Sequence, residues 1–118
     1  MERPDKWTVL KHKNPEGEEY IRIYATWAGG YLTGDGWQMS SGIVKAHQGD
    51  NGYVCTTMSG NEYFCRYRSY GIAGVHNMGV LTNLYERFKN KGHTLTGVGK
   101  YEGEQRIKDK FVGAAESP

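Results

Sequence analysis

The chain has 118 residues, and its 15 Lys and Arg against 13 Asp and Glu give a net charge of only +2. A chain of this length builds one hydrophobic core, so we expect a single domain over residues 1–112 and a frayed tail over residues 113–118. There is no run of the roughly 20 apolar residues that a membrane helix needs, and no apolar stretch like that of a secretory signal follows the N-terminus. These features exclude helical membrane proteins and coiled coils, and they predict a small soluble protein of the cytoplasm whose core relies on nine Tyr and three Trp.

The first part of the chain has the pattern of two paired strands. Trp7–His12 is rich in β-branched and aromatic residues, and Glu19–Trp27 alternates between two faces. Between them, Asn14–Gly17 has the Pro and Gly of a tight turn. In the second strand the more apolar set should face the core: Ile21, Ile23, Ala25 and Trp27.

Further strands are expected up to residue 68. One runs from Trp37 to Val44 with a bend at Gly42, and two more, Tyr53–Met58 and Glu62–Arg68, form a hairpin. A three-residue loop over residues 59–61 would pair residues whose numbers sum to 120. Cys55 then faces Cys65, Tyr53 faces Tyr67 and Thr57 faces Tyr63. All six residues lie on one face of the hairpin, because side chains alternate along a strand.

After Gly71 the hydrophobic spacing becomes that of a helix. Apolar residues recur at intervals of one, three and four and predict an amphipathic helix near residues 78–91, with Asn77 as its N-cap and Gly92 just past its end. Residues 93–101 have the character of a weak strand. The apolar positions of the last segment predict a short terminal helix or docked tail: Ile107, Phe111 and Val112.

Together these elements predict a mainly β (α+β) fold. We expect a curled five- or six-stranded antiparallel sheet, or a small barrel, with one helix packed on it near residues 78–91.

The two cysteines and four histidines carry no recognisable metal motif. The predicted hairpin register sets Cys55 opposite Cys65, so we expect two reduced thiols and keep a cross-strand disulfide as the alternative. These cysteines with His47 and His76 lack the paired spacing of a zinc site. We therefore expect no metal, and all four histidines are expected to lie at the surface or to be satisfied in the core: His12, His47, His76 and His93.

Phosphate loops and catalytic constellations are also absent from the sequence pattern. Residues 92–97 have the glycine spacing of a P-loop, but Val98 and Gly99 stand where that motif needs Lys and Ser or Thr. No nucleophile motif or carboxylate pair rises above chance. We expect no cofactor and no catalytic residue, and so a protein that is not an enzyme; a small hydrolase or nuclease that uses His47, His76 or His93 is the third alternative.

Two classes of binding function remain open. Residues 66–110 have a net charge of +5, and a Tyr interleaved with cations predicts a nucleotide or single-stranded nucleic-acid site made of Arg66, Arg68, Tyr70 and Lys100. Alternatively, aromatic residues beside Gly-rich turns predict a protein-binding surface made of Trp27, Tyr31 and Trp37.

A short stretch resembles small, mostly uncharacterised bacteriophage accessory proteins. It comprises the Trp-x-x-Ser-Ser segment that begins at Trp37 and the Thr-x-Ser-Gly-x-x-Tyr hairpin that begins at Thr57, closing at Tyr70–Gly71. The resemblance implies a non-enzymatic role in the host cytoplasm, such as binding a host protein or countering a host defence. A polar hairpin edge would also allow two chains to pair as a homodimer.

Overall fold

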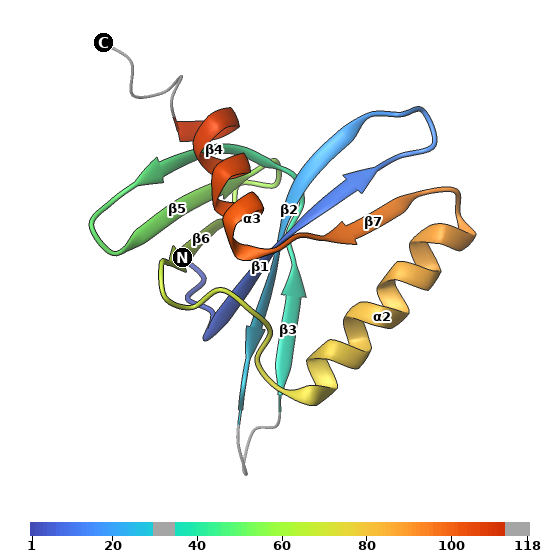
Figure 1. Ribbon diagram of the computed structural model, residues 1–118, viewed down its shortest axis with the longest axis horizontal. Helices are drawn as coiled ribbons and strands as arrows, with labels where there is room; N and C mark the ends of the chain where they lie inside the picture. The colour runs from blue at the N-terminus through green and yellow to red at the C-terminus, as the bar shows by residue number, and fades with distance from the viewer. Residues whose placement is uncertain (30–34, 113–118) are drawn as a thin grey trace.

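The computed structural model describes residues 1–29 and 35–112. Within them the chain forms seven strands and two α-helices, so the expected mainly β fold with a packed helix is confirmed (Figure 1). The predicted tail over residues 113–118 lies outside the described residues. The elements in chain order are β1 (Lys6–Lys13), β2 (Glu19–Trp27), β3 (Gly36–Met39), β4 (Ile43–Gln48), β5 (Gly52–Thr57), β6 (Glu62–Arg66), α2 (Val75–Asn90), β7 (Thr94–Gly97), α3 (Lys100–Ile107) and a last turn, η1 (Lys108–Val112).

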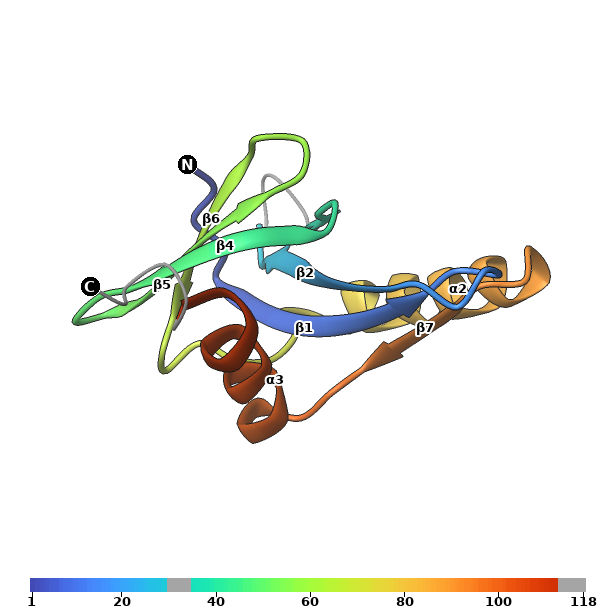
Figure 2. The same cartoon turned by 90° about the horizontal axis from the view of Figure 1, so that it is seen from above.

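The strands form two antiparallel sheets instead of one. The first has the order β3-β2-β1-β7, and the second has the order β4-β5-β6. Figures 1 and 2 show the second sheet and α3 toward one end of the molecule and α2 toward the other. The first turn agrees with its prediction, because Gly17 adopts a φ of +88° and its amide donates to the Asn14 carbonyl.

The expected single strand from Trp37 to Val44 is wrong. The chain leaves the first sheet after β3 and enters the second at β4, so residues 40–42 form a connection between sheets. Ser40 explains the break, because its hydroxyl accepts a hydrogen bond of 2.8 Å from the Ile23 amide and donates one to the Ser41 carbonyl. A hydroxyl that binds the backbone locally competes with a continued strand ladder.

The predicted hairpin exists, but its register differs by two. Tyr53 pairs with Cys65, and Cys55 pairs with Tyr63, so the expected Cys55–Cys65 pairing is wrong. The loop consists of residues 58–60, and Gly60 provides the positive φ that the third position of such a loop requires. Because a slip of two keeps every side chain on its face, both cysteines remain buried, and both thiols are free.

The helix begins earlier than expected. Gly74 is its N-cap residue, with a φ of +84°, and Asn77 is fully buried within the first turn, so the predicted Asn77 cap is wrong. Gly92 follows the helix with a φ of +82°, as expected. The predicted strand over residues 93–101 ends at Gly97, and the terminal helix already begins at Lys100.

Both faces of β2 are covered by other elements of the fold. Ile21, Ile23 and Ala25 face the second sheet and Ile107, as the alternation predicts. Tyr24, on the opposite face, is also fully buried, because α2 packs there through Leu81 and Leu84.

Candidate functional site

A cavity of about 300 Å³ lies where the C-terminal end of α2 meets the first sheet. We call it the cationic cavity. Among the described residues that line it, five of seven have basic or imidazole side chains, and none is Asp or Glu. The lining residues are His12, Arg22, Leu84, Arg87, Phe88, Lys91 and His93.

Strand register and helix spacing bring these residues together. Leu10 pairs with Arg22, so His12, two residues along β1, lies on the same face of the sheet as Arg22. On α2, Leu84, Arg87 and Phe88 share one helix face because they are three and four residues apart. Lys91 lies just after α2, and His93 lies just before β7, the strand that pairs with β1.

Arg22 is half-buried and is not neutralised by a carboxylate among the described residues. Its Nε donates to His12 Nδ1 at 3.1 Å, and its Nη1 donates to the Ser40 carbonyl at 3.0 Å. The guanidinium also lies 5.9 Å from the centroid of the Phe88 ring. A guanidinium has five N–H donors and stays protonated in proteins, although burial lowers the pKa of Arg22. These two bonds therefore leave three N–H donors for a ligand or solvent.

A chain of hydrogen bonds leads from Arg22 to His93. Because Arg22 can only donate, His12 Nδ1 must accept, and the proton of a neutral His12 is on Nε2. His12 Nε2 lies 2.8 Å from His93 Nδ1, so it donates there and leaves the proton of His93 on Nε2. Burial, then the charge of Arg22 and then His93 lower the pKa of His12, which favours the neutral form of this imidazole.

A second hollow adjoins the cationic cavity along α2 and shares Leu84 and Arg87 with it. It also contains Trp37, whose side chain is 42% exposed, together with Val80, Asn83, Glu86 and Asn90. The Trp37 ring centroid lies 6.1 Å from that of Tyr24, with 35° between the ring planes. Trp37 therefore packs beside Tyr24 and still leaves part of its surface exposed.

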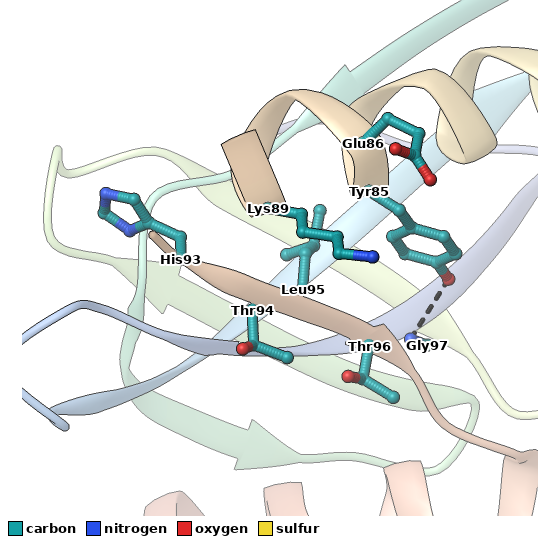
Figure 3. Close-up of a pocket in the computed structure, with 8 residues that line it drawn as sticks. All are labelled: Tyr85, Glu86, Lys89, His93, Thr94, Leu95, Thr96 and Gly97. Atoms are coloured by element: carbon teal, nitrogen blue, oxygen red, sulfur yellow. Dashed lines mark hydrogen bonds between the residues drawn. The ribbon is translucent and has the colours of Figure 1, made fainter. Parts of the chain in front are cut away.

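A third hollow, of about 530 Å³, lies between α2 and β7 (Figure 3). Tyr85 spans it, and its hydroxyl accepts a hydrogen bond of 3.1 Å from the Gly97 amide. Glu86 and Lys89 come from the helix, and Thr94 and Thr96 come from the strand. This hollow mixes a carboxylate with an ammonium, so it has no strong preference for one sign of charge.

The aromatic residues expected to form a protein-binding surface lie in different settings. Trp37 is exposed, whereas Trp27 is half-buried against the core, and its indole donates to the Arg3 carbonyl at 3.0 Å. Tyr31 lies outside the described residues.

The four residues expected to form a nucleic-acid site do not line the hollows described above. Tyr70 connects other elements: its hydroxyl accepts from the Val9 amide at 3.0 Å and donates to the Val98 carbonyl at 2.7 Å, and burial raises its pKa to about 12. Arg66 donates to the Asp5 carbonyl at 3.4 Å. Arg68 and Lys100 are exposed.

Sequence reasoning missed His12, Arg22 and His93 because no local spacing connects them. His12 and His93 are 81 positions apart, and only the pairing of β1 with β7 brings them together. One local signal was present, since Arg22 alternates with Tyr20 and Tyr24 on the less apolar face of β2. In the described ranges no group of three His, Cys, Asp or Glu is placed to share a metal ion.

Comparison of the chain with protein-family models, with curated proteins and with solved structures gives no significant match. The resemblance to bacteriophage accessory proteins therefore stays a prediction. None of the helices in residues 1–29 and 35–112 is long and apolar enough to cross a membrane.

Proposed function

We propose that this chain is a non-enzymatic binding protein whose cationic cavity holds a phosphate-bearing anion. The observation that carries the proposal is the position of Arg22, a half-buried guanidinium that has no carboxylate partner among the described residues. A partly desolvated cation without a counter-ion is costly, and a bound anion would offset that cost.

The surrounding side chains favour phosphate over a single carboxylate. Arg22, Arg87 and Lys91 bring three positive charges to one cavity, and His93 adds an imidazole. A phosphate group has several acceptor oxygens, and guanidinium groups bind them through two parallel hydrogen bonds. Phosphate can therefore use more of these donors at once than a carboxylate can.

Calorimetric titration with pyrophosphate tests this proposal. We expect the wild-type protein to bind it at one site, with an affinity that falls as salt is added. Arg22→Met keeps the length of the side chain but removes the charged donors, and we expect it to lower the affinity at least tenfold, because a hydrogen bond to a charged group contributes about 1.5–3 kcal/mol. Arg87→Met, at an exposed position, gives the same test without a partly buried change.

The matched control is Lys45→Met, which removes an exposed cation from β4 in the other sheet and is expected to leave binding unchanged. The proposal is refuted if the wild-type protein does not bind pyrophosphate, or if both arginine variants bind it as well as the wild type does. If Arg68→Met lowers the affinity for pyrophosphate and the other two arginine variants do not, the phosphate site lies in the basic segment expected from the sequence, residues 66–110.

A protein partner that contacts Trp37 is the second candidate function. Its support is the exposure of this indole on the edge strand β3, since tryptophan is usually well buried and is a frequent anchor of interfaces. A host protein remains the proposed partner under the phage resemblance. If Trp37→Ala, with an unchanged melting temperature, captures the same proteins from a host lysate as the wild type does, this candidate is excluded.

A further inference from the structure

The cationic cavity and the Trp37 hollow form one continuous surface along α2. Leu84 and Arg87 line both of them. Arg87 thus stands between a cavity lined by cations on one side and an exposed indole on the other. A ligand with an anionic end and a planar end would contact both.

We propose that the ligand of this surface is a nucleotide, with its phosphates in the cationic cavity and its base stacked on Trp37. This inference rests on the proposed function, which places phosphate in the cationic cavity, and it adds a site for the base. The two hollows have volumes of about 300 and 410 Å³, within the size range of small-ligand sites.

Trp37 is suited to hold a base because Tyr24 packs beside its ring and its side chain is still 42% exposed. A ring that packs against a neighbour keeps its orientation, and an exposed indole can stack on any base. The fully buried Tyr24 is in turn fixed by a hydrogen bond of 2.6 Å from its hydroxyl to the Asn77 carbonyl on α2.

The polar residues beside Trp37 fit the edge of a base better than a phosphate. Asn83 and Asn90 have amide groups that both donate and accept hydrogen bonds, and Glu86 accepts them. Base edges present mixed donors and acceptors, whereas phosphate presents only acceptors. The Glu86 carboxylate therefore disfavours phosphate in this hollow, while no described residue that lines the neighbouring cavity has a carboxylate. The distribution of charge thus orients the ligand.

The test compares ligands that have or lack each part. Wild-type protein is titrated by calorimetry with ADP, GDP, CDP and UDP, with pyrophosphate as the ligand without a base, and with a single-stranded tetranucleotide. Trp37→Leu keeps an apolar side chain against Tyr24 but removes the π-face. The matched control is Tyr101→Leu, which removes an exposed aromatic ring from α3. Melting temperatures confirm that each variant is folded.

We expect at least one nucleoside diphosphate to bind more tightly than pyrophosphate. Trp37→Leu should lower that affinity about tenfold, as expected for a lost stacking contact. It should leave pyrophosphate binding unchanged, and Tyr101→Leu should change neither. If the tetranucleotide binds more tightly than any free nucleotide and is equally sensitive to Trp37→Leu, the nucleotide is part of a single strand.

Two results would overturn the inference. If all four nucleotides bind no more tightly than pyrophosphate, or if Trp37→Leu leaves their affinity unchanged, the base has no site and only the phosphate site stands. If neither pyrophosphate nor any nucleotide binds, the proposed function fails with it.

Discussion

Asn77 connects α2 to the first sheet, and its replacement by alanine should destabilise the whole fold. The side chain is fully buried, and its Nδ2 lies 2.7 Å from the Ala73 carbonyl, 3.0 Å from the Gly36 carbonyl and 3.3 Å from the Trp27 carbonyl. These acceptors come from the approach to the helix, from β3 and from β2. One amide group thus satisfies backbone groups of three segments.

The size of the effect follows from these contacts. The two Nδ2 hydrogens contribute about 1 kcal/mol each, and the buried or partly buried carbonyls that lose this donor add a further 1–3 kcal/mol. Alanine recovers part of this loss, because it favours the helix by about 0.5 kcal/mol and removes the Oδ1 atom, which is buried without a hydrogen-bond partner among the described residues. The net loss of unfolding free energy is about 3 kcal/mol, or a melting temperature lower by about 12 °C at this chain length.

Thermal and urea unfolding followed by circular dichroism measure this loss. Asn83→Ala makes the same chemical change at an exposed position of the same helix and should stay within about 0.5 kcal/mol of the wild type. If Asn77→Ala melts within about 2 °C of the wild type, the three carbonyls do not depend on this amide and our account of how α2 is held is wrong.

Other predictions concern the backbone, the thiols and the tyrosines. Gly52→Ala should prevent stable folding, because a Cβ there would lie 2.3 Å from the Cys65 carbonyl oxygen, whereas Gly79→Ala, with open space around it in α2, should raise stability by up to about 1 kcal/mol in urea unfolding. Both thiols are free and buried, and burial raises the pKa of the Cys65 thiol, so the two cysteines should react with a thiol reagent only after denaturant is added. A fast reaction in the native protein would contradict this. Burial also raises the pKa of Tyr24 and of Tyr70 to about 12; the folded state then holds protons that the unfolded state releases above pH 10, and stability should fall as pH rises from about 10 to 12. Unfolding midpoints that stay constant over this range would refute the assignment.

The amino-acid sequence by itself determined the elements that depend on local pattern. β1 and β2 and the turn between them follow from alternation and from the Pro and Gly of that turn, and α2 follows from apolar residues at helical spacing. The two faces of the β5–β6 hairpin were also predictable, because period-2 alternation assigns faces even where the register is wrong by two residues.

Only the tertiary structure decided which elements pair and what covers each face. The change of sheet at Ser40 depends on a hydroxyl that bonds to β2, 17 positions earlier in the chain. The burial of Tyr24 depends on where α2 packs. Alternation shows that a strand has two faces, but it cannot show that a helix from a later part of the chain covers the more polar one.

The candidate site belongs to this second class. Arg22 lies on β2, His12 lies on β1, and His93 lies just before β7. Their chain of hydrogen bonds exists only because β1 pairs with β2 on one side and with β7 on the other. Long-range pairing is chosen by burial and hydrogen bonding across the whole fold, so no spacing in the sequence records it. Local periodicity could therefore predict the strands and the helix, while the cationic cavity appeared only when they were assembled.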